Sequence, residues 1–304
     1  MNPAIGTLAP GLYLVATPIG NARDITLRAL DILSSADVLA AEDTRSLRRL
    51  MEIHGIALGG RSIVAYHDHN GPRARPRLIA DLAAGRSVAY ASEAGTPLIA
   101  DPGFDLAREA VAGGYAVTSA PGPTALAAAL SVAALPTDKV LFAGFLPNTA
   151  SARRRALSEL ASVPATLVFY ESPKRLGAML ADASETLGGE RRAAVCRELT
   201  KKFEEARRDT LSALAETYRD APPKGEIVVV IDRGQKGDIN EDAVETALRE
   251  ALRHGSVRDA AAGVAMAFAL PKRQVYQLAM QIKGRGDDDS DSDEPDGIGA
   301  GDGV

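Results

Sequence analysis

Short apolar runs alternate with amphipathic stretches along the first half of the chain. Two of the amphipathic stretches, at residues 26–34 and 44–54, have the spacing of apolar positions that is typical of helices. The apolar runs between such stretches are predicted strands, at residues 12–16, 38–41, 62–66, 88–91 and 116–119. Strands and helices in regular alternation predict an α/β domain with a parallel sheet, here over residues 1–137.

A second series of strands begins after Pro136. A basic helix is predicted to start at Ser151, and residues 227–231 form the continuous apolar run expected of a strand buried on both faces. The other predicted strands are residues 140–146, 165–170, 192–197 and 203–208. We therefore predict a second α/β domain over residues 138–234.

The rest of the chain follows a different pattern. Residues 234–240 have the composition of a linker, and a helix-turn-helix-like unit is predicted over residues 241–283. From residue 284 onward the chain is rich in Gly, Ser and Asp, with too few apolar side chains to offset the entropic cost of ordering. Residues 284–304 are therefore predicted to be a disordered acidic tail. The helical patterns lie at residues 242–252, 257–268 and 271–282.

This tail changes the meaning of the net charge. The 304 residues include 35 Lys and Arg against 40 Asp and Glu, for a formal net charge of -5. Eight of the acids lie in the basic-free stretch 287–304; without them 32 acidic residues face 35 basic ones, so the rest of the chain is mildly basic. Clusters of Arg and Lys can neutralise phosphates, so an RNA partner is not excluded. The clusters are residues 153–155, 174–175, 191–192, 201–202 and 207–208.

Several functional classes are excluded by what the sequence lacks. The single cysteine, Cys196, excludes a disulfide framework and a zinc site with several cysteines. There is no G-x-G-x-x-G fingerprint and no Walker A loop. His67 and His69 lie two residues apart without further ligands nearby, so no metal is expected. No signal peptide or membrane span is evident, which favours a cytoplasmic protein.

Three loops rich in small residues follow the first, fourth and fifth predicted strands, at residues 16–21, 92–97 and 120–125. Small side chains let backbone groups approach a ligand closely, and proline fixes the turns. Ligands of α/β sheets bind beyond the carboxyl ends of the strands. The three loops, one of which carries the carboxylate of Glu93, therefore predict a pocket for a polar ligand.

A series of short motifs runs along the chain in a characteristic order. They are Leu14–Asn21, Ala41–Arg45, His67–Asn70, Ser92–Pro97, Asp101–Gly103, Pro121–Pro123, Gly144–Pro147, Phe169–Ser172, Arg197–Lys201 and Gly225–Glu226. In the order and sequence of these motifs, the chain resembles the bacterial 16S ribosomal RNA (cytidine-2'-O)-methyltransferases, which have the tetrapyrrole-methylase fold of the class III S-adenosylmethionine (SAM) methyltransferases. The resemblance extends over residues 12–231, and the helical unit resembles a C-terminal extension of part of the family. Glu93 is a departure, since the family more often has Asp there.

The resemblance implies two α/β domains with SAM in the cleft between them, usually in a homodimer. It also implies methyl transfer to the ribose 2'-hydroxyl of a cytidine in the decoding centre, the P-site region of 16S rRNA, with the small ribosomal subunit as partner. Carried onto matching positions, it implies a set of cofactor contacts. They are Pro18, Gly20, Asn21, Ser92, Glu93, Ala94, Gly95, Thr96, Pro121, Gly122, Pro123, Thr124 and Leu135.

Methyl transfer to a sugar hydroxyl needs alignment and a group that takes the proton. Alignment can supply about 7 to 11 kcal/mol, and a general base about 10²- to 10⁴-fold in rate. The stretch Glu42–Arg45, which follows the second predicted strand, is the first candidate. In it Asp43 can accept the proton or hold the ribose, and Arg45 can bind an adjacent phosphate. Equally, the stretch can be the start of a helix, with Asp43 or Thr44 as its N-cap.

Glu198 and Lys201 are the second candidates for this chemistry, with a strand-end salt bridge as the alternative. His67 and His69 rank third. RNA recognition is expected to rest on charge and shape, because the chain has no Trp and only 4% aromatic residues to offer as a stacking platform.

Two other functions stay open at this point. A tetrapyrrole-type small-molecule or diphthine-like SAM methyltransferase would share the cofactor loops but lacks the run His67–Asn70 together with Arg197–Lys201. A non-catalytic ribosome-binding factor would use the basic domain and the helical unit without binding SAM.

Overall fold

The computed structural model describes residues 6–234, 241–268 and 272–288. The chain divides into two compact units, one of residues 1–159 and 164–233 and the other of residues 160–163 and 234–304. The first unit contains two five-stranded sheets, and the second contains three helices.

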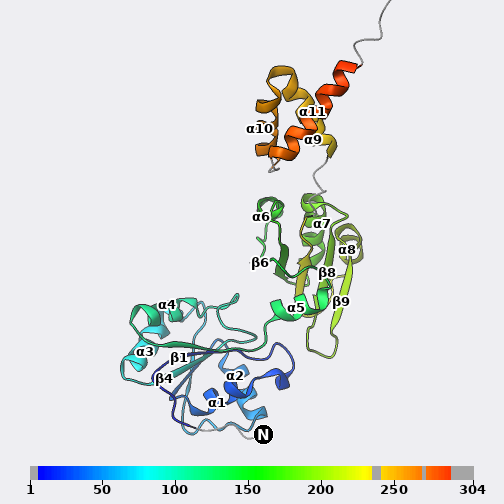
Figure 1. The fold of residues 1–304 in the computed structure, drawn as a ribbon. Coiled ribbons are helices and arrows are strands. Elements are labelled where there is room, and N and C mark those ends of the chain that lie inside the picture. The colour runs from blue at the N-terminus through cyan, green and yellow to red at the C-terminus, as the bar shows by residue number, and fades with distance from the viewer. Residues whose placement is uncertain (1–5, 235–240, 269–271, 289–304) are drawn as a thin grey trace, which may run out of the picture. The chain divides into compact units, whose positions relative to one another are not determined.

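The first sheet is entirely parallel, as the alternating pattern predicts (Figure 1). Its strand order is β3-β2-β4-β1-β5. The strands are β1 (Gly11–Val15), β2 (Val38–Ala41), β3 (Ile63–Ala65), β4 (Ser87–Ala91) and β5 (Val117–Ala120). The intervening helices are α1 (Leu27–Ser35), α2 (Thr44–Ile53), α3 (Gly71–Ala83) and α4 (Phe104–Ala112), and a short 3-10 helix spans Ala22–Asp24.

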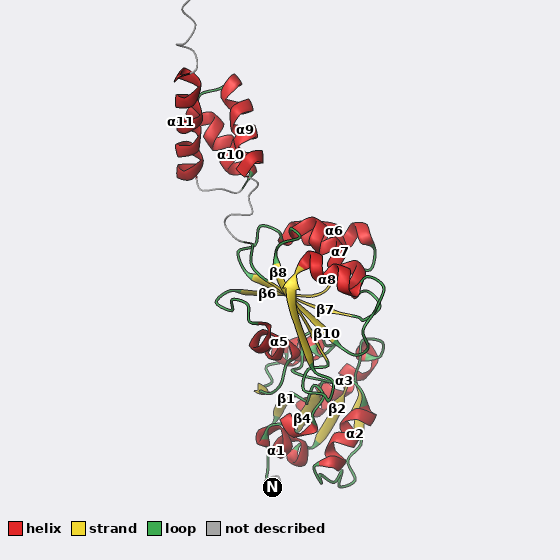
Figure 2. Cartoon of the chain, turned by 90° about the vertical axis from the view of Figure 1, so that its right-hand side faces the viewer, coloured by secondary structure: helices red, strands yellow, loops and turns green. Residues whose placement is uncertain are grey.

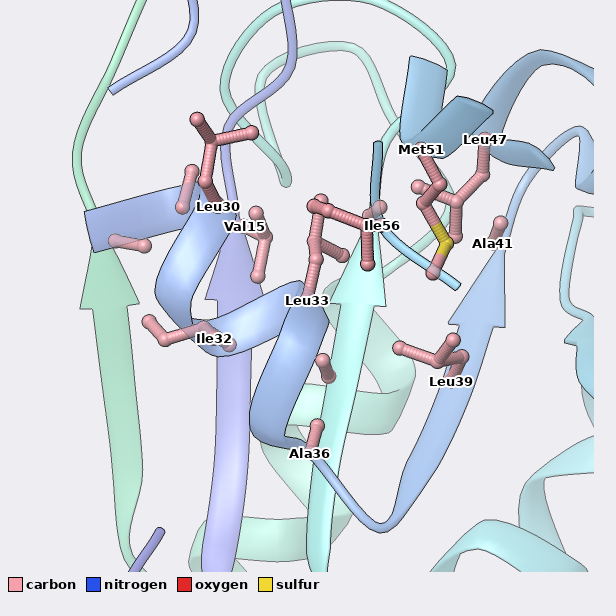
Figure 3. Close-up of a cluster of buried hydrophobic side chains, with 14 residues drawn as sticks. Val15, Leu30, Ile32, Leu33, Ala36, Leu39, Ala41, Leu47, Met51 and Ile56 are labelled. Atoms are coloured by element: carbon pink, nitrogen blue, oxygen red, sulfur yellow. The ribbon is translucent and has the colours of Figure 1, made fainter. Parts of the chain in front are cut away.

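Both faces of this sheet are covered, because successive strand residues point to opposite sides. Leu39 lies in a cluster with side chains of α1 and α2, whereas Val38 and Ala40 belong to a cluster with α3 and α4. Figure 3 shows the first cluster, in which Leu33 of α1 and Met51 of α2 lie over the strands. Because both faces of the sheet carry apolar side chains, we expect polar side chains that can bind a ligand in the loops at the strand ends.

The second sheet is mixed, with the order β6-β7-β10-β8-β9 (Figure 2). Only β6 and β7 pair in parallel; the other neighbours are antiparallel. The strands are β6 (Val140–Phe145), β7 (Thr166–Glu171), β8 (Arg192–Arg197), β9 (Glu205–Thr210) and β10 (Ile227–Ile231). The helices are α5 (Ala125–Ala133), α6 (Ala150–Leu160), α7 (Leu176–Leu187) and α8 (Leu211–Tyr218).

Helix α5 joins the two sheets of the first unit. It follows β5 of the first sheet directly but packs on the second sheet, where Ala129 and Ala133 lie among the buried side chains of Cys196 and Val228. Ile19, from the loop after β1, belongs to the same cluster. One apolar core therefore fixes the loops of the first sheet against strands of the second.

The helical unit consists of α9 (Glu241–His254), α10 (Val257–Ala267) and α11 (Lys272–Asp288). Its core includes Leu248, Val264 and Val275. Helix α11 continues to Asp288, so the prediction of a tail from residue 284 is wrong for residues 284–288. A helix that has formed propagates at little cost, which carries it past the end of the apolar pattern. The rest of the predicted tail, and residues 235–240 of the predicted linker, lie outside the described residues.

One strand is displaced from its prediction. The polar strand expected at residues 203–208 is β9, Glu205–Thr210, because residues 203 and 204 belong to the loop between β8 and β9. Within the described part of the chain, no helix has the length and apolar character needed to cross a membrane.

Candidate active site

The loops after β1, β4 and β5 lie side by side, because these strands are neighbours in the sheet. The loops of β1 and β4 are joined by an isolated antiparallel bridge, in which Thr17 N–H donates to Gly95 O at 2.9 Å and Gly95 N–H donates to Thr17 O at 3.0 Å. The Thr96 hydroxyl donates to Pro123 O at 2.9 Å and so attaches the third loop. The predicted convergence of the three loops at one sheet edge is therefore present.

Two positions show why these loops need glycine. Gly95 has a φ of +86°, and a Cβ there would lie 3.3 Å from Ile19 Cγ2. A Cβ on Gly122 would lie 2.8 Å from Ala16 Cβ. Any larger residue at either position would push the loops apart.

Two cavities adjoin at this edge. The first, of about 500 Å³, lies between the loops of the first sheet and strands of the second. The second, of about 660 Å³, is bordered by the β1 loop, by α2 and by Lys201. Four residues border both cavities: Ile19, Glu93, Ala94 and Glu226.

The predicted site residues divide between these cavities. Gly95, Thr96 and Thr124 line the first cavity. Pro18, Gly20, Asp43, Arg45, Ser92 and Lys201 line the second, and Glu93 and Ala94 line both. The others predicted, which line neither cavity, are Asn21, Pro121, Gly122, Pro123, Leu135 and Glu198.

Asp43 occupies the N-cap position of α2. Its carboxylate accepts hydrogen bonds from the backbone N–H of Arg45 at 2.7 Å and of Ser46 at 3.3 Å. The Arg45 guanidinium also donates to it at 3.0 Å. The hydrogen bonds from Arg45 lower the pKa of Asp43 to about 2, so this carboxylate is a weak proton acceptor. The local geometry therefore shows Asp43 in the helix-capping role that was the alternative to proton acceptance.

Glu42, the residue before Asp43, belongs to the stretch preferred from the sequence but was given no role there. It directly follows β2, and its backbone N–H donates to Ala91 O at 3.3 Å. Glu42 lines the first cavity, whereas Asp43, at the N-cap of α2, lines the second. Its Oε2 accepts the backbone N–H of Glu93 at 3.3 Å. Burial raises the pKa of Glu42, and the nearby carboxylate of Asp101 adds to this effect.

Glu198 and Lys201 form an ion-pair network with Glu226. Lys201 Nζ lies 3.0 Å from both Glu198 Oε1 and Glu226 Oε2. The backbone N–H of Glu226 donates to Glu198 Oε1, and this bond lowers the pKa of Glu198. Burial opposes the charged form of Lys201, but the two carboxylates outweigh it and raise its pKa. The predicted strand-end salt bridge is present, and only Lys201 of the predicted pair reaches a cavity.

Glu171, at the end of β7, is a second residue that sequence reasoning did not select. Its side chain is 1% exposed. Oε1 accepts the backbone N–H of Ser172 at 2.7 Å and lies 3.3 Å from Arg175 Nε. Oε2 is buried and finds no hydrogen-bond donor among the described residues, although Glu171 lines the first cavity. A buried acceptor of this kind calls for a donor from a ligand.

His67 and His69 line neither cavity, and their rings stack edge to face with centroids 6.1 Å apart. Over the described ranges, no group of three or more His, Cys, Asp and Glu is arranged to hold a metal ion.

Comparison with known proteins agrees with this fold. The family profile of the Tetrapyrrole (Corrin/Porphyrin) Methylases matches residues 11–215, and that of the RsmI C-terminal HTH domain matches residues 238–283. The chain is 48% identical to the ribosomal RNA small subunit methyltransferase I of Mesorhizobium japonicum, over 92% of this chain and 96% of that one. It is 43% identical to the protein of the same name from Pseudomonas aeruginosa, over 90% and 98%.

Solved structures share the fold at lower sequence identity. A diphthine synthase superposes with a TM-score of 0.57 at 15% identity, covering 73% of this chain and 89% of that one. The uroporphyrin-III C-methyl transferase of Thermus thermophilus, complexed with S-adenyl homocysteine, superposes with a TM-score of 0.50 at 21% identity, over 72% and 96%.

The capping role of Asp43 predicts a pH-dependent contribution to stability. Because its pKa falls from 3.8 to about 2 on folding, the carboxylate stabilises the fold above pH 3.8, and this contribution is lost as the pH falls toward 2. Asp43→Ala is expected to cost about 1 kcal/mol at neutral pH, and Asp43→Asn less, since Asn also caps helices. Denaturant unfolding between neutral pH and pH 2 measures this. An equal pH dependence in wild type and Asp43→Asn would contradict it.

Proposed function

The chain belongs to the tetrapyrrole methylases and, within them, to the ribosomal RNA small subunit methyltransferase I family, and we propose that it methylates the ribose 2'-hydroxyl of a cytidine in the decoding centre of 16S rRNA, with SAM as methyl donor. The observation that carries this proposal is the pair of adjoining cavities: the first has four carboxylates and no cationic side chain in its lining, whereas the second has three cationic side chains beside three carboxylates. The name of the relatives supports small-subunit rRNA as the substrate.

We assign SAM to the first cavity. The loop Glu93–Thr96 and the start of α5 provide small side chains that allow close backbone contact. Four carboxylates line the same cavity, from Glu42, Glu93, Glu171 and Glu226. They suit a cationic ligand, and the unpartnered Oε2 of Glu171 suits a cationic donor in particular. When bound, SAM supplies an electrophilic methyl group on a sulfonium centre.

We assign the target nucleotide to the second cavity. Arg45 and Arg49 of α2 and Lys201 of the β8–β9 loop line it, so it offers cations to a phosphodiester. The same cavity is lined by the carboxylates of Asp43, Glu93 and Glu226. The Arg45 side chain is 91% exposed yet tied to Asp43, so its guanidinium is held near the cavity while it stays open to an RNA phosphate. On this assignment Asp43 positions Arg45 and α2 and does not take the proton.

We assign proton acceptance to Glu42. It lines the first cavity, and its Oε2 bonds the N–H of Glu93, a residue that borders both cavities. Glu42, whose pKa is raised, is a stronger base than Asp43, the N-cap of α2, whose pKa is lowered. This replaces our sequence-based preference for Asp43.

The proposal is tested with purified protein, methyl-labelled SAM and small ribosomal subunits. We expect label at a ribose, detected as an alkali-resistant internucleotide linkage at a cytidine. Label on a base, or none on any rRNA substrate, would contradict the proposal. SAM binding without rRNA methylation would favour a small-molecule methyltransferase, and failure to bind SAM would favour a non-catalytic ribosome-binding factor.

Substitution of the proposed base should reduce turnover. Glu42→Gln is expected to lower kcat by about 10²- to 10⁴-fold and to leave SAM affinity nearly unchanged. In wild type the rate should fall as the pH drops through the raised pKa of Glu42, and this limb should be absent in the variant. Asp43→Asn is the matched control, and a loss there as large as in Glu42→Gln would return the base role to Asp43.

The assignment of SAM to the first cavity predicts a binding defect at its buried wall. Glu171→Gln keeps the side-chain shape but removes the charge, and it is expected to weaken SAM binding about 10- to 150-fold. Isothermal titration calorimetry measures this independently of turnover. Glu226→Gln, whose side chain is 74% exposed at the same cavity, is the control and should lose less. Equal SAM affinity of Glu171→Gln and wild type would rule out a contact between Glu171 and SAM.

A further inference from the structure

The loop between β8 and β9, residues 198–204, presents an exposed aromatic side chain close to the second cavity. Lys201 of this loop lines that cavity. Two residues further on, Phe203 is 64% exposed, and Lys202 Nζ lies 5.6 Å from the centroid of its ring. A single exposed apolar side chain is ordinary on a protein surface, so only the surroundings of Phe203 can indicate a partner.

The loop is held in place at both ends. Within it, Thr200 N–H donates to Glu204 Oε2 at 2.6 Å, and Glu204 N–H donates to Lys201 O at 3.1 Å. Asn21 N–H, in the loop after β1, donates to Thr200 Oγ1 at 3.2 Å. A Cβ on Gly20 would lie 2.8 Å from that same oxygen, so the two loops are in close contact.

Part of the loop adopts a strained backbone. Glu198 and Thr200 have φ values of +51° and +67°, a left-handed region that residues with a Cβ enter only at a cost in free energy. The hydrogen bonds around them maintain this conformation. The loop therefore holds Lys202 and Phe203 exposed to solvent in a fixed conformation before any ligand binds.

The charges around Phe203 suit a polyanion. Lys202 lies against its ring and Lys201 beside it in sequence, while Arg45 lies on the same cavity as Lys201. The two neighbouring acids are already engaged, Glu204 by the N–H of Thr200 and Glu205 by Arg197 at 3.2 Å. Lys201 is paired with Glu198 and Glu226, and Arg45 with Asp43, so Lys202 is the cation that lies against the ring. An apolar ring with a cation against it matches the chemistry of single-stranded RNA, in which bases stack and phosphates pair.

We propose that Phe203 stacks on a base of the RNA strand next to the nucleotide in the second cavity, while Lys202 contacts the adjoining phosphate. The proposal rests on the proposed function. It adds a single stacking contact where the low aromatic content predicts no stacking platform. Base stacking tolerates any base, so Phe203 would fix the strand and leave the choice of cytidine to other contacts.

The chain contains no Trp, so Phe203→Trp introduces a unique fluorescent reporter that can still stack. Oligocytidylate added at low salt is expected to quench its emission, and so is protein-free 16S rRNA. Phe104→Trp is the matched control. Phe104 is 59% exposed with Arg108 5.5 Å from its ring centroid, but no residue within three positions of it lines either cavity, whereas Lys201, two positions from Phe203, lines the second. The reporter at position 104 should therefore not respond.

A second variant measures the size of the contact. Phe203→Ala is expected to weaken binding to small ribosomal subunits about 5- to 150-fold, with SAM affinity unchanged and binding restored in Phe203→Tyr. Quenching by small subunits but by neither RNA would indicate docking on a ribosomal protein and would overturn the proposal. Unchanged binding of Phe203→Ala would also overturn it. Failure of methyl transfer with intact quenching would instead overturn the proposed function and leave the stacking contact standing.

Discussion

The antiparallel bridge between Thr17 and Gly95 is the contact on which the two cavities depend. Its two backbone hydrogen bonds join the loops that follow β1 and β4, and they hold Glu93 and Ala94 where both cavities meet. The bridge forms because its strands are neighbours in a parallel sheet, so their carboxyl ends reach the same edge. It also requires glycine, since position 95 combines a left-handed φ with close contact to Ile19.

The second half of the site comes from residues distant in sequence, and α5 accounts for this. A helix that follows β5 would ordinarily cover the first sheet, but α5 buries its alanines on the second. Strand ends near Glu171 and Gly225 are thereby placed opposite the loops of the first sheet. The same packing brings the β8–β9 loop against Gly20, so that Lys201 reaches the second cavity.

The strands and the site differ in how much of each could be predicted from the sequence. Apolar periodicity was sufficient for the strands of the first sheet and for the meeting of its three loops, because both follow from local pattern and parallel topology. It could not choose between Glu42 and Asp43, because adjacent residues of one loop line different cavities in the folded chain. Glu171 was out of reach because only the folded chain reveals that one carboxylate oxygen is buried without a donor. The homodimer involves a second copy of the chain and stays a prediction.

The two cavities differ in the charged side chains that line them. Carboxylates are the only charged side chains in the lining of the first cavity, whereas Arg45, Arg49 and Lys201 share the second with Asp43, Glu93 and Glu226. A cationic cofactor is therefore attracted to the first cavity, where no cation opposes it, over distances at which salt screens only in part. In the second cavity Asp43 is paired with Arg45, and Glu226 with Lys201, so a phosphate there depends on short contacts to cations whose positions are already fixed. On the proposed assignment, the reacting groups meet along the border formed by Glu93, Ala94 and Glu226, and the electrostatic attraction of the cofactor contributes to alignment before any hydrogen bond to a ligand forms.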